Sequence, residues 1–346
     1  MSDDILLDTC GRLCADHVTP HLLAAAERGD FPAATWAAVE AAALHRALVP
    51  EASGGFGVPV IDALALLRVA AQHALPLPLA ETMFASMLLG GAGLEIPEGP
   101  LTLTADPALK LRREGSGWQL TGRAAAVAWA RDAAAIAVLA EHDGKNYIAL
   151  LRNGAWQSTP GANVAREPRD TIGINTTLPP EAVAPTDMTR KQVRAVGAAM
   201  RTIMIAGVLD AITGMTVQYA QDRVQFGRSI GKFQAIQHNL AILASQTAAA
   251  AAAADTAAEA VADGIRIPAI AAAKTRAGEA ATIAAGLAHQ IHGAIGFTYE
   301  HRLHFFTKRL WAWRDEYGGE AEWSLLLGRH MAAAGADRLW PEITAI

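Results

Sequence analysis

Cysteine is nearly absent from this sequence: its 346 residues include Cys10 and Cys14 and no other. The two lie four residues apart on an expected helix, which favours free thiols in a reducing compartment over a disulfide or half of a zinc site. The start, Met-Ser-Asp-Asp, is acidic where a secretory signal would be basic. We therefore expect a cytoplasmic protein without a metal site.

Charge and long apolar runs are also scarce. Charged residues make up 18% of the chain and the formal net charge is −5, so a nucleic-acid or anionic-membrane partner is not expected. A membrane-spanning helix needs about twenty consecutive apolar residues, and the nearest approach, the alanine-rich run 247–254, is too short. These absences exclude classes of protein but name no chemistry.

Alanine is what the sequence has in excess, at about a fifth of its residues. Residues 1–98 combine helix formers with apolar residues at helical spacing, which predicts an N-terminal helical domain. Residues 99–187 hold short apolar or alternating runs separated by glycine, which predicts a small, mostly antiparallel central β-domain. Residues 188–346 return to helical patterns and predict a C-terminal four-helix bundle.

The expected fold class is therefore mainly α with a central β-domain. The bundle is predicted from four long helical segments, at 190–223, 235–263, 270–292 and 322–334. Alanine is concentrated within the second of them, where small side chains would let helices approach closely while keeping a high helix propensity.

The connection between the first two bundle helices, residues 221–237, is unusual for an exposed loop. It carries Phe226 and Phe233 beside the cation Arg223. An aromatic face next to a guanidinium suits a planar ring that is attached to phosphates. An ordinary helix–helix turn, with phenylalanines packed on the bundle, explains the same residues, and on the residues alone it is the favoured reading.

A second segment follows the third bundle helix. Gly293 and Gly296 come just after Gln290 and would let the backbone approach a ligand closely, with amides available to a phosphate. Ordinary capping of the helix explains one of these glycines equally well.

Taken together, the two segments resemble the acyl-CoA dehydrogenases, flavin enzymes that introduce an α,β-double bond into a coenzyme A thioester. The family pattern has an Arg-x-x-Phe-Gly element, a downstream Phe-Gln and a later Gln-x-x-Gly-x-x-Gly-Phe element. The residues that match it in order are Arg223, Phe226, Gly227, Phe233, Gln234, Gln290, Gly293, Gly296 and Phe297. The loop 49–57 and the α–β–α order are also similar to the family, so the resemblance covers almost the whole chain.

The resemblance implies FAD as cofactor, held at its adenosine-pyrophosphate end and commonly across a subunit interface. It implies Arg223 on the pyrophosphate and Gln234 near the adenosine. The implied binding residues further include Phe226 along the cofactor with Gly227, and Gln290, Gly293 and Gly296 at the diphosphate or adenine end. A site shared between chains implies a homo- or hetero-oligomer (a dimer or tetramer), with acyl-CoA as substrate and an electron-transfer flavoprotein or similar electron acceptor.

The carboxylate base that the reaction needs is missing from both of the family's usual positions. Those positions hold Gly318 and Gly197. Glu320 is the nearest substitute as catalytic base, followed by Glu316, and Asp210 lies inside the first bundle helix. On the residues alone, the favoured explanation of Glu320 is an acid at a helix N-terminus, where it opposes the helix dipole.

The β-domain departs from the family as well. The threonine that usually donates to the flavin is missing, and Trp129 is the candidate for the usual indole, although a core role explains it as well. Trp311 and Trp313 are candidates for the wall of a broad pocket, or for core or subunit contacts.

These gaps and the short chain resemble the compact subunits of heteromeric acyl-CoA dehydrogenases from steroid side-chain degradation. The subgroup's stretch corresponds to residues 296–309, whose basic side chains are candidates for a phosphate contact or for a solvated or subunit-facing helix; they are His301, His304, Lys308 and Arg309.

Three functions follow from the resemblance. The first is FAD-dependent α,β-dehydrogenation of an acyl-CoA thioester, with a bulky or steroid-derived acyl group. The second is a catalytically silent FAD-binding subunit of a heteromeric acyl-CoA dehydrogenase. The third is other flavin chemistry on the same fold, since a fold does not fix a reaction.

Overall fold

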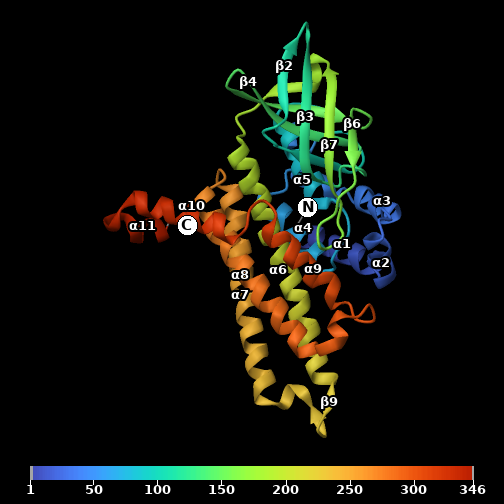
Figure 1. The fold of residues 1–346 in the computed structure, drawn as a ribbon, viewed down its shortest axis with the longest axis vertical. Coiled ribbons are helices and arrows are strands. Elements are labelled where there is room, and N and C mark those ends of the chain that lie inside the picture. The colour runs from blue at the N-terminus through green and yellow to red at the C-terminus, as the bar shows by residue number, and fades with distance from the viewer. Residues whose placement is uncertain (1–2, 345–346) are drawn as a thin grey trace. The chain divides into compact units, whose positions relative to one another are not determined.

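The computed structural model describes residues 3–344, and the chain forms two compact units (Figure 1). The first takes residues up to 63 together with 76–193, and the second takes 64–75 together with the chain from 194 onward. The expected three-part order of helices, strands and helices is confirmed. The domain boundaries at 98 and 187 stay predictions.

The helices of the first unit come from the N-terminal part of the chain. They are α1 (Asp3–His17), α2 (Pro20–Glu27), α3 (Ala33–Ala41) and α5 (Leu79–Gly91), with short 3-10 turns η1 (Leu44–Arg46) and η2 (Glu51–Ser53). The start of α2 follows from its sequence, because Thr19 accepts a hydrogen bond from the Leu22 amide and Pro20 occupies the first turn. Cys10 and Cys14 are both buried in α1.

The strands of this unit form two four-stranded sheets. The first has the order β1 (Leu101–Thr104), β4 (Ala135–His142), β5 (Lys145–Arg152), β8 (Val183–Pro185), and the second the order β2 (Lys110–Glu114), β3 (Gly117–Ala128), β7 (Arg169–Leu178), β6 (Trp156–Thr159). The β1–β4 pairing is parallel and the other pairings in these sheets are antiparallel, so the β-domain is mostly antiparallel, as expected. Apolar side chains of both sheets form one core that includes Leu120, Ile136 and Ile172.

The second unit is built from helices. They are α4 (Val60–Gln72), α6 (Arg190–Asp222), α7 (Gln234–Ala262), α8 (Ile267–His292), α9 (Leu303–Asp315), α10 (Glu320–Ala334) and α11 (Leu339–Thr344). By length and composition α6 could cross a membrane, but 83% of its most apolar window is buried inside the protein, as in the core helix of a bundle.

Small residues decide how closely these helices pack. A Cβ on Gly207 of α6 would lie 2.1 Å from the backbone oxygen of Arg68, so α4 can cross α6 at this depth only over a glycine. Arg68 then pairs with Asp210 one turn further along α6, at 2.9 Å. Alanines that are buried on both α7 and α8, such as Ala257 and Ala281, fit the close packing that the sequence predicts.

Helix α9 was not among the four predicted bundle helices. Much of it consists of aromatic and β-branched residues of modest helix propensity, such as Phe305, Phe306 and Thr307. These are buried on several sides of the helix, together with the polar His304 and Arg309, so the segment has no clean apolar stripe to reveal it. Tertiary packing stabilises this helix against its weak local signal.

Candidate functional site

The two segments that carry the family resemblance meet at one end of the helical unit. Tyr219, in the last turn of α6, stacks on His292, the last residue of α8, with ring centroids 4.5 Å apart. The Tyr219 hydroxyl also donates a hydrogen bond to the His292 carbonyl at 3.3 Å. These contacts bring the chain before Arg223 next to the chain before Gly293, although about seventy residues separate them.

The first segment forms a small hairpin, β9 (Val224–Gln225) with β10 (Arg228–Ser229). Phe226 and Gly227 form its tip, both at positive φ (+54° and +76°), and the Phe226 side chain is 91% exposed. Positive φ is costly for a phenylalanine, and a fully exposed ring forgoes the free energy of burial. A turn whose phenylalanines pack on the bundle would do neither, so this explanation does not fit Phe226.

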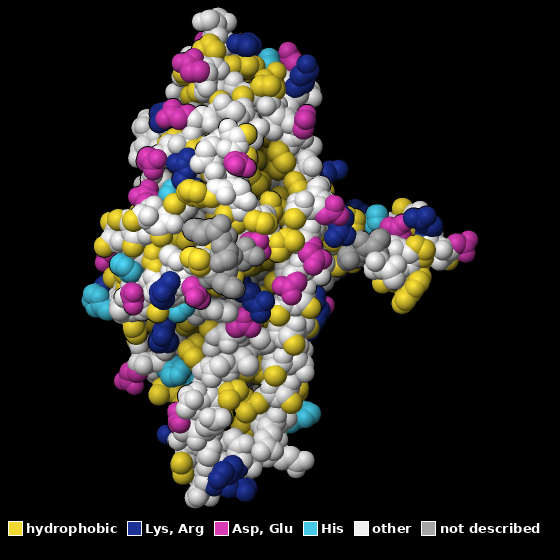
Figure 2. Space-filling view, turned by 180° about the vertical axis from the view of Figure 1, so that it is seen from behind, with side chains coloured by type: hydrophobic (Ala, Val, Ile, Leu, Met, Phe, Trp, Pro, Cys, Tyr) yellow, Lys and Arg dark blue, Asp and Glu magenta, His cyan; other side chains and the backbone are white. Residues whose placement is uncertain are grey.

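The hairpin is stiffened by its own aromatic and cationic groups. The ring of Phe233 lies 6.2 Å from that of Phe226 in an edge contact, and the Arg228 guanidinium lies over Phe233 at 4.2 Å. Arg223 remains exposed at the end of α6. Figure 2 shows basic side chains at the end of the bundle that carries this hairpin, at the bottom of the view.

The two glycines of the second segment differ in role. At Gly293, with φ +64°, a Cβ would meet no atom within 4 Å, so the backbone there is open to a ligand. At Gly296 a Cβ would lie 3.1 Å from side-chain atoms of His292 and Leu303, so this glycine permits packing within the chain. Phe297 is 66% exposed and stacks on His289 at 4.1 Å.

The chemistry of this end of the bundle fits a dinucleotide. Gln234 lines an open groove at the start of α7 with Ala235, Gln237 and His238, and Gln290 is exposed at the end of α8. A guanidinium, amides, an open glycine backbone and an exposed aromatic ring are the groups that hold phosphates and a planar base. The predicted set Arg223, Phe226, Gln234, Gln290 and Gly293 is therefore brought to one end of one unit.

The first usual base position, Gly318, is covered by an arginine. Arg194, near the start of α6, donates from Nε to the Tyr317 carbonyl at 3.0 Å and pairs with Glu322. A Cβ on Gly318 would lie 2.1 Å from the Arg194 guanidinium, and φ is +104° there, a conformation that favours glycine. A glutamate at this position would have to displace a cation and adopt a strained backbone.

The second usual position is covered by a ring. A Cβ on Gly197, one turn along α6 from Arg194, would lie 2.4 Å from the Tyr317 ring. Tyr317 itself has φ +57° and its carbonyl accepts a second hydrogen bond, from the Trp323 indole at 3.2 Å. Both positions are therefore occupied by side chains that hold each other in place.

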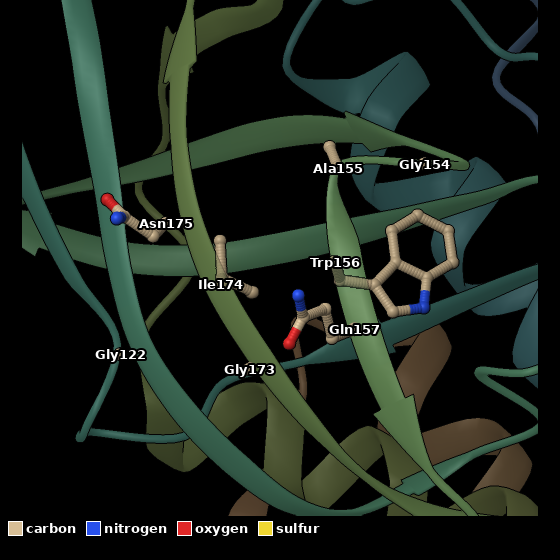
Figure 3. Close-up of a pocket in the computed structure, with 8 residues that line it drawn as sticks. All are labelled: Gly122, Gly154, Ala155, Trp156, Gln157, Gly173, Ile174 and Asn175. Carbon is tan, nitrogen blue, oxygen red and sulfur yellow. The ribbon is translucent and has the colours of Figure 1, made fainter.

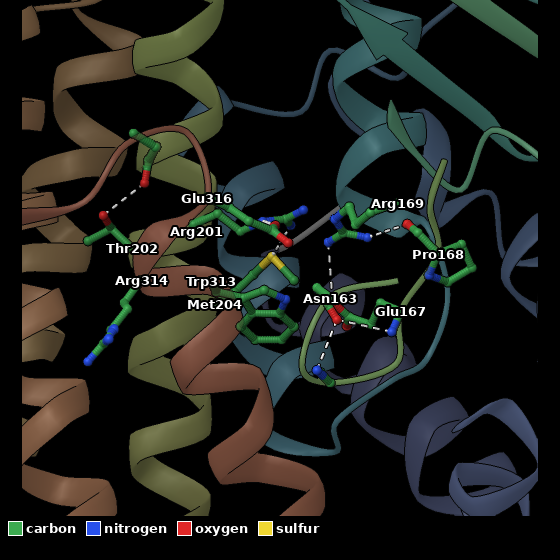
Figure 4. A network of polar contacts seen from close by, with 12 residues as sticks. Asn163, Glu167, Pro168, Arg169, Arg201, Thr202, Met204, Trp313, Arg314 and Glu316 are labelled. Carbon is green, nitrogen blue, oxygen red and sulfur yellow. Dashed lines mark hydrogen bonds and ion pairs between the residues drawn. The ribbon is translucent and has the colours of Figure 1, made fainter. Parts of the chain in front are cut away.

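The acids that the sequence offers as substitutes are engaged elsewhere. Figure 4 shows Glu316 against Arg201, with Nε to Oε2 at 2.7 Å and the arginine side chain 3% exposed. Asp210 pairs with Arg68 and also accepts from Gln72. The carboxylate of Glu320 rests on α8, where a Cβ on Gly278 would lie 2.6 Å from its Oε1.

Lys274 of α8 is a buried cation beside these acids. Its Nζ donates to the Trp313 carbonyl at 3.1 Å and also to that of Arg314. Burial lowers the pKa of Lys274 to about 8, although the nearby carboxylates of Glu320 and Glu316 act to raise it. Lys274 therefore places a buried cation beside the two acids that lie nearest to the Gly318 position in the sequence.

The remaining candidates lie in packed surroundings. Trp129 is buried in the first unit with its edge against Phe31 at 6.3 Å, and its place beside a flavin stays a prediction. Trp313 is buried under Arg201, while Trp311 is partly exposed and stacks on His289. The basic stretch is not a solvated face throughout, because the packing of α9 buries His304 and Arg309.

A hollow on the second sheet does not add to this site. Figure 3 shows it on strands β3, β7 and β6, and its lining consists of Gly122, Gly154, Ala155, Trp156, Gln157, Gly173, Ile174 and Asn175. This lining offers amides and an indole but no titratable group, so it cannot supply a base or bind a phosphate by charge.

The residues that sequence reasoning missed are those that act through tertiary contacts. Tyr219 lies four residues before Arg223, so helical spacing places it on the face that leads to the hairpin, and this signal could have found it. Arg194 and Lys274 carry no such signal, because their partners lie more than a hundred and about forty residues away along the chain.

Comparison with known proteins agrees with this geometry. Residues 191–322 match the acyl-CoA dehydrogenase C-terminal domain and residues 2–95 match the acyl-CoA dehydrogenase N-terminal domain. The chain is 29% identical over 318 residues to the acyl-CoA dehydrogenase IpdE2 of Mycobacterium tuberculosis. This match covers 88% of this chain and 89% of that protein.

Two solved structures share the fold. The ChsE4-ChsE5 complex from Mycobacterium tuberculosis superimposes with a TM-score of 0.87 at 22% identity, over 96% of this chain and 98% of the other. The Tcur3481-Tcur3483 steroid ACAD G363A variant gives a TM-score of 0.84 at 23% identity, over 96% and 98%.

The contact between Arg194 and Gly318 predicts a measurable coupling. Gly318→Ala should lower the free energy of unfolding by about 2 kcal/mol, because it adds a Cβ at positive φ and against the guanidinium. In an Arg194→Ala background this cost should fall by about 1 kcal/mol, since the clash is gone. Chemical denaturation of the four proteins measures both values.

Gly328→Ala in α10 is the matched control, because a Cβ there meets no atom within 4 Å and should stabilise the helix slightly. Equal costs of Gly318→Ala with and without Arg194 would contradict the contact.

Proposed function

The chain belongs to the acyl-CoA dehydrogenase family, and from this premise we propose that it is a catalytically silent, FAD-binding subunit of a heteromeric acyl-CoA dehydrogenase. It completes the flavin site of a related subunit that carries the base. This proposal takes the second of the three functions that the resemblance implies, because the geometry around Gly318 and Gly197 disfavours the first.

The observation that carries the proposal is the filling of both base positions. Arg194 lies against Gly318 and Tyr317 lies against Gly197. Removing an α-proton needs a carboxylate with an elevated pKa in a dry pocket. A guanidinium at that place stabilises anions instead, so this chain's own pocket lacks the group that would start the reaction.

A second observation separates the cofactor residues from that pocket. Arg194 and Arg223 stand near opposite ends of α6, and at 1.5 Å per residue their backbones are about 44 Å apart. One FAD molecule cannot span this distance. The cofactor residues around the hairpin therefore serve a flavin whose reacting ring lies against another subunit.

The cofactor residues have distinct tasks in this proposal. FAD, when bound, supplies the acceptor for the hydride that leaves the β-carbon. Arg223 neutralises the pyrophosphate, and the open backbone at Gly293 offers an amide to it. Gln234 and Gln290 bind and orient the adenosine end, and the exposed ring of Phe226 covers the cofactor from solvent.

The partner and the substrate are inferred from the relatives. ChsE4-ChsE5 is a complex of two different chains, and Tcur3481-Tcur3483 is a steroid ACAD. We infer by similarity that this chain assembles with a related subunit and that the complex acts on a bulky, steroid-derived acyl-CoA thioester, passing electrons to an electron-transfer flavoprotein or a similar acceptor.

Flavin retention tests the cofactor part of the proposal. Arg223→Ala should weaken FAD binding to the reconstituted complex by roughly ten- to a hundredfold, the value of a hydrogen-bonded charge. Flavin absorbance after gel filtration measures it. Arg112→Ala, an exposed arginine on β2, is the matched control and should retain FAD fully. Equal retention by both variants would contradict the assignment.

Turnover tests the silent role. Glu320→Gln in the reconstituted complex should leave kcat within about twofold, because Glu320 rests on α8 beside Lys274 and takes no proton in this proposal. Loss of a general base costs about 10²-fold or more. A loss of that size, with FAD content unchanged, would instead make Glu320 the base and this chain a dehydrogenase in its own right.

A further inference from the structure

We propose that the first unit carries a site for a divalent transition-metal ion of the zinc class, formed by Glu40, His45 and Glu98. One ligand atom from each of these side chains lies within 4.8 Å of the others. The sequence predicted no metal site, because these residues are not spaced as a metal motif. Glu40 and His45 lie on either side of a turn, and Glu98 comes from the connection into β1.

The turn between α3 and η1 brings the first two ligands together. Ala43 adopts φ +54°, an unusual value for a residue with a Cβ. The chain reverses there, so that His45 faces back toward Glu40. Glu40 is fixed in turn, because its Oε1 accepts a hydrogen bond from the Gly99 amide at 2.9 Å. That bond also holds the adjacent Glu98 beside the same turn.

His45 is the observation that points to a ligand. Its side chain is 4% exposed, and within residues 3–344 its Nδ1 atom is buried with no hydrogen-bond partner. A buried imidazole nitrogen without a partner is costly unless a polar guest satisfies it.

The donor set selects the ion. One imidazole and two carboxylates match Zn²⁺ and its neighbours, whereas Mg²⁺ and Ca²⁺ prefer oxygen alone. Donor atoms around a tetrahedral zinc lie about 3.3 Å apart, so ligand atoms that lie within 4.8 Å of one another must close by up to about 1.5 Å. Glu98 can make this movement, because its side chain is 80% exposed and its 3.4 Å pair with Arg46 is a weak surface contact.

The consequence is structural. A metal held by these residues would fasten the turn after α3 to the connection that enters β1. It would leave a fourth position for water, because the protein supplies three ligands.

Zinc titration of the purified chain, stripped with a chelator, tests the site. We expect one Zn²⁺ per chain in competition with a chromophoric chelator, and a rise in Tm at saturating Zn²⁺. Glu98→Gln should weaken this binding by at least tenfold and remove most of the rise in Tm. His45→Gln should have the same effect if this variant folds. If it does not fold, the Glu98→Gln variant alone tests the site, because Glu98 is exposed.

Glu95→Gln is the matched control. Glu95 lies on the same connection, is 66% exposed and pairs with Arg152, so its loss should leave zinc affinity and the Tm shift unchanged. The proposal is overturned if the stripped wild-type chain takes up no zinc, or if the Glu98→Gln variant binds it as tightly as the wild type does.

Discussion

The contact of Arg194 with the Tyr317–Gly318 backbone is the constraint on which the chemistry of the helical unit depends. One guanidinium donates to the Tyr317 carbonyl, pairs with Glu322 and lies over the Trp323 ring at 5.0 Å. It thereby ties the start of α6 to the connection between α9 and α10. The family resemblance implies a base on that connection, and the contact places the Arg194 guanidinium there instead.

The two ends of the helical unit differ: side chains are packed at the closed end, around Arg194, and exposed at the open end, around Phe226. Near Arg194 the side chains satisfy one another, and the cations Arg201 and Lys274 add positive charge around the acids that remain. At the end of α6 the opposite holds, because Phe226 is exposed at positive φ and Gly293 is open. We propose on this ground that the chain, with its predicted cofactor residues at the open end, serves a neighbouring subunit.

The sequence predicted the parts that depend on local patterns. Helix α6 was expected at 190–223 and runs Arg190–Asp222, and α7 was expected at 235–263 and runs Gln234–Ala262. Both have long stretches of helix formers, and turn residues follow them. Helix α9 was missed because packing of Phe305 and Phe306, and not local propensity, stabilises it.

The candidate site was predictable only in part, for a related reason. The motif residues were identified, but not which glycine is open, since Gly296 packs against His292 and Gly293 does not. Arg194 was invisible because its partner lies 123 positions along the chain. The side chains that lie against Gly318 and Gly197 come from distant parts of the chain, so local sequence spacing does not predict them.

The most direct test of the central claim uses an acyl-CoA thioester that carries deuterium on its α-carbon. Mass spectrometry measures how fast this deuterium is lost in the presence of this chain and FAD but without a partner subunit. It reports the base alone, before any hydride moves. The account predicts that the chain alone leaves the rate of deuterium loss at its value for the thioester in buffer. The rate should rise when a related subunit that carries the family glutamate is added. Exchange well above that background by the chain alone would contradict it.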